Sequence, residues 1–202
     1  MSRELLILSG GRSSEREVSL RSGRAVAAAL PDARLVELSE DALPAWIDSA
    51  RHAVLPMLHG GWGEGGGLQA ELEARGVPFA GSSSVASRLC MDKVATKARL
   101  RAAGVPVAPE VAFDASLPPR PEELLAALGS EIFLKPADQG SSVGLRRALG
   151  LAEIATALAS LTGTGRWMAE PLLRGREMTV GLLDGKAMGV VEIVAEGGVY
   201  DY

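Results

Sequence analysis

Residues 133–147 read FLKPADQGSSVGLRR, and this stretch decides the fold. Lys135 ends an apolar run that is typical of a buried strand, and the polar turn GSSVG follows at 140–144. A charge at such a strand end needs solvent or a partner, because burying it unpaired is costly. A lysine and loop amides together form a good anion site, so phosphate is the expected ligand. The order differs from the P-loop, in which the lysine follows the glycines.

The composition is that of a soluble globular protein. The 202 residues are 47% hydrophobic and 23% charged, which suits one or two domains with an ample core. A net charge of −4 gives no basic surface for nucleic acid. Cys90 is the lone cysteine, so no internal disulfide forms; we expect a cytoplasmic protein and a buried thiol. The N-terminal apolar run is too short for a membrane span, and it lacks the small-residue cleavage site of a signal peptide.

Strands and helices alternate in the first part of the chain. The expected strands are 4–8, 34–38 and 53–58, separated by helices at 14–30 and 41–51. The first helix is expected to start with a capping box at Ser14–Glu17. This rhythm predicts a small, open parallel sheet.

The rhythm changes near residue 107, after a helix expected at 82–103. Strands are expected at 107–113, 131–136, 143–147, 166–170, 177–183 and 187–194, with helices at 121–128 and 150–161. Asp184-Gly185 is a good hairpin turn. We therefore predict an α/β protein whose second part is an α+β unit with antiparallel pairing, and a boundary near 90–106.

Two glycine clusters, 10–11 and 60–67, follow strands of the first part. Ligands of such sheets bind at the carboxyl ends of the strands. Glu15 is there either as a helix-capping residue or as an anion for a ligand ammonium group. His59 is either a packing residue or part of a site, and His52 is expected at the surface.

Charged residues of the second part suggest a nucleotide. Lys93 and Lys97 share a helix face, which is most often a solvated basic stripe. The apolar strand end AEPLL (169–173) suits the edge of an adenine, and Glu177 could accept from ribose hydroxyls. Together with Lys135, these residues fit a nucleotide between two antiparallel sheets.

Six blocks identify a family. They are GGRSSEREVSLRSG (10–23), LHGGWGEGGGLQ (58–69), AGSSSVASRLCMDKVATK (80–97), FLKPADQGSSVG (133–144), EPLLRGREMTVGLL (170–183) and YDY (200–202). In this order and across the whole chain they resemble the D-alanine–D-alanine ligases, which are ATP-grasp enzymes of cell-wall synthesis. The resemblance implies a pre-ATP-grasp domain at 1–92 and a central ATP-grasp domain at 93–202.

The resemblance also implies the chemistry. The γ-phosphoryl group of ATP passes to the carboxylate of one D-alanine, and the amine of a second D-alanine attacks the acyl phosphate. Negative charge must be neutralised throughout. The products are D-alanyl-D-alanine for peptidoglycan synthesis, ADP and phosphate. Mg²⁺ or Mn²⁺ is the implied cofactor, and a homodimer is the implied assembly.

Roles in the family carry over to matching positions. Lys93 and Lys135 match the phosphate-contacting lysines, and the amides of Gly140, Ser142, Val143 and Gly144 would cover the phosphates. Glu15 matches the acid that anchors the first D-alanine and hydrogen-bonds Ser141, and both are expected in catalysis. His59 would shape the D-alanine site. Around adenine and ribose the matching residues are Glu170, Leu173 and Glu177.

The sequence departs from the family in the glycine loop and at its end. Gly65 stands where the family usually has aspartate, and Trp62 adds bulk nearby. The family also continues beyond YDY with an arginine and the metal ligands, so we expect no metal site in these 202 residues and little or no turnover by them alone. A ligase for D-lactate or D-serine, or a non-catalytic remnant, remains an alternative.

Overall fold

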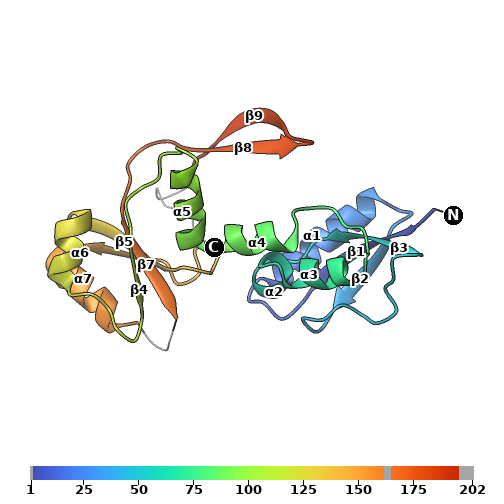
Figure 1. Cartoon of the computed structure of the whole chain (residues 1–202), viewed down its shortest axis with the longest axis horizontal. Coiled ribbons are helices and arrows are strands. Elements are labelled where there is room, and N and C mark those ends of the chain that lie inside the picture. Colours follow the sequence, from blue (N-terminus) through green and yellow to red (C-terminus); the bar gives the residue numbers. More distant parts are fainter. Residues whose placement is uncertain (1, 162–164, 196–202) are drawn as a thin grey trace. The chain divides into compact units, whose positions relative to one another are not determined.

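The computed structural model describes residues 2–161 and 165–195. It divides into two compact units, Met1–Ala102 and Ala103–Tyr202 (Figure 1). The functional boundary predicted between residues 92 and 93 stays a prediction.

A three-stranded parallel sheet forms the centre of the first unit. Its strands are β1 (Glu4–Gly10), β2 (Arg34–Leu38) and β3 (His52–Pro56), in the order β2-β1-β3. Central β1 is a continuous apolar run because both of its faces are covered, and Leu6, Ile7 and Leu8 are fully buried. The predicted parallel sheet is confirmed.

Five helices belong to the described part of the first unit. They are α1 (Arg16–Ala29), α2 (Gly61–Glu64), α3 (Gly67–Ala74), α4 (Ser84–Met91) and α5 (Lys93–Ala102). The single helix expected at 82–103 is wrong, because the extended backbone of Asp92 ends α4. Its carboxylate then accepts a hydrogen bond from the amide of Ala95 at 3.0 Å, which caps the start of α5.

Two smaller expectations about these helices are also wrong. The residue that precedes α1 is Glu15, and its side chain makes no capping hydrogen bond, so the capping box is not formed. Cys90 is exposed rather than buried. The buried side of α4 carries Ser84, and Cys90, six residues later, lies on another side of the helix. None of the helices in the described part of the chain is long and apolar enough to cross a membrane.

The helix predicted at 41–51 is absent, and turns take its place. Asp48 accepts hydrogen bonds from the amides of Ala50 and Arg51, both at 3.0 Å, and so supports a turn instead of a helix. Hydrogen bonds from the Arg51 side chain are the main reason that the pKa of Asp48 is lowered. His52, expected at the surface, is buried against Trp46, with ring centroids 5.4 Å apart.

The extra bulk of Trp62 is accommodated by a glycine. A methyl group at Gly67 would lie 2.3 Å from Cδ1 of Trp62, so the indole packs directly on the backbone that opens α3. The indole Nε1 donates to Glu71 at 3.2 Å. Gly65, the other departure, has no space for a side chain, because its Cβ would lie 2.6 Å from the carbonyl oxygen of Gly61.

We expect Gly67→Ala to lower the free energy of unfolding by about 1–3 kcal/mol, as overpacking commonly does. Urea denaturation measures the change. Gly175→Ala is the control, because the space around Gly175 is open. Adding Trp62→Ala to Gly67→Ala should remove the clash, and an unchanged midpoint for Gly67→Ala alone would contradict this packing.

The second unit is built on a four-stranded antiparallel sheet. The strands are β4 (Val111–Asp114), β5 (Glu131–Pro136), β6 (Arg146–Leu149) and β7 (Arg166–Pro171), in the order β4-β7-β5-β6. Helices α6 (Pro121–Leu128) and α7 (Gly150–Ala159) contribute to its core, in which Leu124, Ile132, Leu134 and Ile154 are fully buried. The antiparallel pairing confirms the prediction, although β6 starts three residues later than expected.

Strands β8 (Glu177–Leu183) and β9 (Lys186–Ile193) form a separate two-stranded sheet. Asp184 (φ 49°) and Gly185 (φ 73°) connect them with left-handed backbone, the conformation that a two-residue type I′ turn requires. The predicted hairpin is confirmed. Many of its apolar side chains are exposed, among them Leu182 and Val190.

Candidate functional site

Glu15 lies where the carboxyl end of β1 meets the glycine loop that follows β3. It is 7% exposed, and a methyl group added to Gly60 would lie 2.7 Å from its Oε2, so the carboxylate is packed against that loop. Ser13 fixes this approach: its hydroxyl donates to the carbonyl of His59 at 2.6 Å and accepts from the amide of Glu15 at 3.2 Å. A buried carboxylate at this edge is suited to an ammonium group.

His59 is held on both sides of its ring. Nε2 lies 3.1 Å from the hydroxyl of Ser22, and Nδ1 lies 3.3 Å from the Glu64 carboxylate. The carboxylate favours the tautomer protonated at Nδ1, which leaves Nε2 to accept from Ser22. Glu64 is fixed in turn by the amide of Gly60, which donates to it at 2.9 Å.

A cavity of about 380 Å³ lies beside this histidine. Polar side chains line part of it: Ser22, His59, Glu64, Gln69, Ser82 and Ser87. Gln69 donates to the carbonyl of Gly63 at 2.9 Å, and its buried Oε1 accepts no hydrogen bond within the described residues. Since the Gly63 carbonyl can only accept, the amide orientation is fixed by this contact.

Lys135, a charged residue in a strand, pairs with an acidic residue of the neighbouring strand. Its ammonium is hydrogen-bonded and ion-paired to the carboxylate of Glu170. The register explains the contact: Lys135 pairs with Met168 on β7, and Phe133 pairs with Glu170, so the two charges are diagonal neighbours. Both side chains are largely buried, at 24% and 18% exposure, so this pair is shielded from solvent.

A second cavity, of about 680 Å³, opens beside this ion pair. It is lined by Phe133, Lys135, Ser142, Leu145 and residues 170–177. Charges of both signs and several leucines share the lining. A ligand with an anionic part and a flat apolar part fits such a surface.

The loop after β5 has an unusual backbone. Ser141 (φ 49°) and Ser142 (φ 58°) are both left-handed, which is uncommon for residues other than glycine and concentrates at functional sites. Gly144 (φ 74°) packs on the ring of Pro136, where a Cβ would lie 2.9 Å from Cγ. The loop is thereby folded back on the strand that carries Lys135.

Comparisons with known proteins agree with this geometry. A family model described as "D-ala D-ala ligase C-terminus" matches residues 100–202. The chain belongs to the D-alanine–D-alanine ligase family. A D-alanine–D-alanine ligase of Synechococcus sp. (strain JA-3-3Ab) is 38% identical, over 98% of this chain and 64% of that protein. One from Anaeromyxobacter sp. (strain Fw109-5) is 40% identical, over 99% and 67%.

Solved structures of this family share the fold. The D-alanine–D-alanine ligase from Bacillus anthracis complexed with ATP matches with a TM-score of 0.82 and 26% identity, over 97% of this chain and 67% of that one. D-alanyl-alanine synthetase A from Vibrio cholerae matches with a TM-score of 0.80 and 28% identity, over 100% and 70%. The predicted ATP-grasp fold is confirmed. The chain spans about two thirds of the length of these relatives.

Within this ligase fold the expected site residues form two groups. Glu15 and His59 meet at one edge of the first unit, where Ser13 links their backbones. Around the larger cavity of the second unit lie Lys135, Ser142, Glu170, Leu173 and Glu177. Gly140, Ser141, Val143 and Gly144 belong to the loop but do not line that cavity, and Lys93 begins α5 in the first unit. Their roles in the ligase reaction stay predictions.

Sequence reasoning missed Ser13, Ser22 and Arg174, which the structure places at these two sites. Ser13 was readable as a polar residue two positions after the glycine pair Gly10-Gly11 at the end of β1. Ser22 and Arg174 gave no such signal, because their neighbours come from distant parts of the chain.

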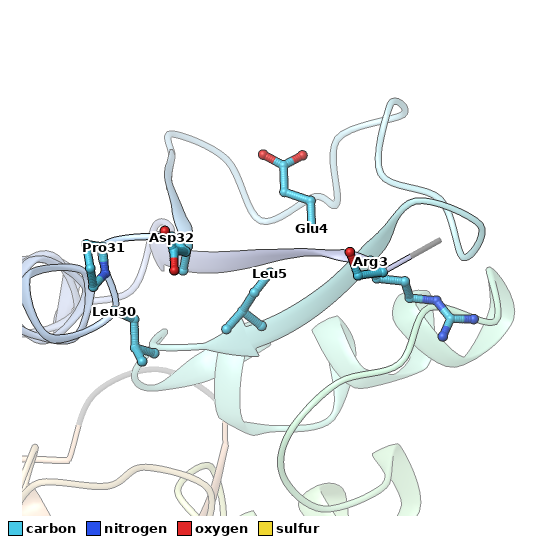
Figure 2. A pocket seen from close by; sticks show the side chains of 8 residues that line it. Arg3, Glu4, Leu5, Leu30, Pro31 and Asp32 are labelled. Carbon is cyan, nitrogen blue, oxygen red and sulfur yellow. The ribbon is translucent and has the colours of Figure 1, made fainter.

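Another hollow, of about 520 Å³, lies at the amino end of β1 (Figure 2). The carboxylate of Glu4 and the side chain of Leu5 point to opposite sides of that strand. It holds none of the residues matched to the ligases.

Across residues 2–161 and 165–195, no group of three or more His, Cys, Asp or Glu side chains could hold a metal ion. The described residues therefore do not by themselves fit a Mg²⁺ site.

Proposed function

We propose that the native protein joins two D-alanines to D-alanyl-D-alanine at the expense of ATP, by way of an acyl phosphate. The observation that carries the proposal is the cavity of the second unit, which is lined by Lys135 and by Ser142 of the glycine-serine loop, whose backbone is left-handed there. The relatives named D-alanine–D-alanine ligase and the Bacillus anthracis structure with ATP support it.

In this proposal the residues matched to the ATP site bind the nucleotide. Lys135 and Lys93 attract the phosphates, and the amides of 140–144 cover them and exclude water, which protects the acyl phosphate from hydrolysis. Glu170, Leu173 and Glu177 contact adenine and ribose. In the structure the charge of Lys135 is balanced by Glu170. The phosphates therefore either compete with the Glu170 carboxylate for the ammonium of Lys135 or bind this ammonium together with it.

The first unit in the same proposal binds the amino acid. Glu15 receives the ammonium of the first D-alanine and orients Ser141, and His59 shapes the pocket. The remaining features follow from the family: a Mg²⁺ or Mn²⁺ cofactor, a homodimer, and a cytoplasmic role in peptidoglycan synthesis.

The test is phosphate release by the native protein. We expect ATP to yield phosphate only when D-alanine is supplied, with D-alanyl-D-alanine formed in equal amount, because the carboxylate must be present to accept the γ-phosphoryl group. L-Alanine is the matched control substrate. Phosphate release at the same rate without D-alanine would refute the proposal.

A further inference from the structure

The larger cavity lies beside the second half of β5. Glu131, Phe133 and Lys135 alternate with buried residues and so lie on one face of the strand. The cavity is lined by Phe133 and Lys135 on this face. Glu131 is four residues from Lys135, or about 13 Å along a strand that rises about 3.3 Å per residue. Lys135 and Glu131 thus lie at opposite ends of this face of β5.

Glu131 holds the segment that leads from β7 to β8. Its backbone carbonyl accepts from the amide of Leu172 at 2.9 Å. Its carboxylate accepts from Nη2 of Arg174 at 2.6 Å, and Nη2 of Arg147 lies 3.7 Å from the other oxygen. Leu172, Leu173 and Arg174 all line the cavity, so one residue anchors this wall through both its main chain and its side chain.

The two ends differ in chemistry. Phosphates are attracted to the ammonium of Lys135. The wall near Glu131 offers leucine side chains, which suit a flat base, and its arginines already pair with carboxylates, Arg174 with Glu131 and Arg176 with Glu192. Resting on the proposed binding of ATP, we infer that Glu131 and Arg174 are positioning residues: their ion pair fixes the wall against which the nucleoside part of ATP packs. Neither needs to touch the nucleotide through its charged group.

Comparing two ligands distinguishes an effect on the nucleoside-binding wall from a general loss of phosphate binding. ATP and inorganic tripolyphosphate are titrated against a fluorescent ATP analogue bound to the native protein. We expect Arg174→Ala to weaken ATP binding about three- to fivefold, in keeping with an exposed ion pair, and to leave tripolyphosphate binding within about twofold. Arg174→Lys should restore most of the affinity for ATP. Arg24→Ala, which breaks the exposed pair with Glu37, is the matched control and should change neither.

A double-variant cycle tests the pair itself. Glu131→Gln combined with Arg174→Ala should weaken ATP binding no more than the stronger of the two single changes, because both remove one interaction. Additive losses, equal losses of ATP and tripolyphosphate, or wild-type affinity of Arg174→Ala for ATP would each overturn the inference. A native protein that bound neither ligand would instead refute the proposed function, and the inference with it.

Discussion

Replacing Lys135 with alanine is expected to lower the turnover of the native protein by about 100-fold or more. In the proposed reaction, negative charge on the transferred phosphoryl group must be neutralised in a partly closed site, where one cation contributes strongly. The structure adds a reason for a large effect: this ammonium is largely shielded from water, so its interaction with phosphate is screened less than at the surface. Steady-state phosphate release with saturating D-alanine measures it.

The same change also takes the ammonium away from Glu170, so catalysis and folding have to be separated. Lys135→Ala combined with Glu170→Gln removes both charges of the pair and should be as inactive as Lys135→Ala while melting closer to the wild type. Lys186→Ala, at the start of β9, is the control lysine and should retain activity. Near-normal turnover of Lys135→Ala would reduce its role to that of a strand residue paired with Glu170.

Changing Glu15 to glutamine is expected to raise the KM for D-alanine by about tenfold or more and to lower kcat as well. The amide keeps the shape of the side chain but loses the charge that would hold an ammonium, and charge-assisted hydrogen bonds are about twice as strong as neutral ones. The slower chemistry follows from the predicted second role of Glu15, which is to orient Ser141. Initial rates over a range of D-alanine concentrations give both constants.

Glu17 supplies the matched control for this change. It is the acidic residue in the first turn of the same helix and is exposed, so Glu17→Gln alters the helix dipole interaction without touching the candidate pocket. We expect its KM and kcat to be those of the wild type. An unchanged kinetic profile for Glu15→Gln would remove Glu15 from the substrate site and leave it as the residue that precedes α1.

Sequence patterns predicted the elements correctly where the signal is local to the segment itself. The apolar run of β1 and the Asp184-Gly185 turn each carry their own local signal, and the structure confirms both. The segment 41–51 failed because its two core residues, Leu43 and Ile47, have helical spacing while Asp48 bonds the local amides in a turn. Local hydrogen bonding outweighed the periodicity.

The candidate site was predicted in its residue types and not in its contacts. Lys135 was expected to need a partner, but Glu170 is 35 residues away and is identified only by the strand register. Likewise, the contact of His59 with Ser22 joins a loop to the middle of α1. Such pairs depend on which strand lies beside which, and that information is absent from local spacing.

The hairpin of β8 and β9 has a consequence for handling the protein. A two-stranded ribbon is marginally stable in water on its own. Among the described residues it pairs with no third strand, so its outer edges present main-chain groups ready to bond another strand, beside exposed Leu182 and Val190. A polypeptide limited to these residues is therefore expected to self-associate through this ribbon, and the extent of association would increase with protein concentration.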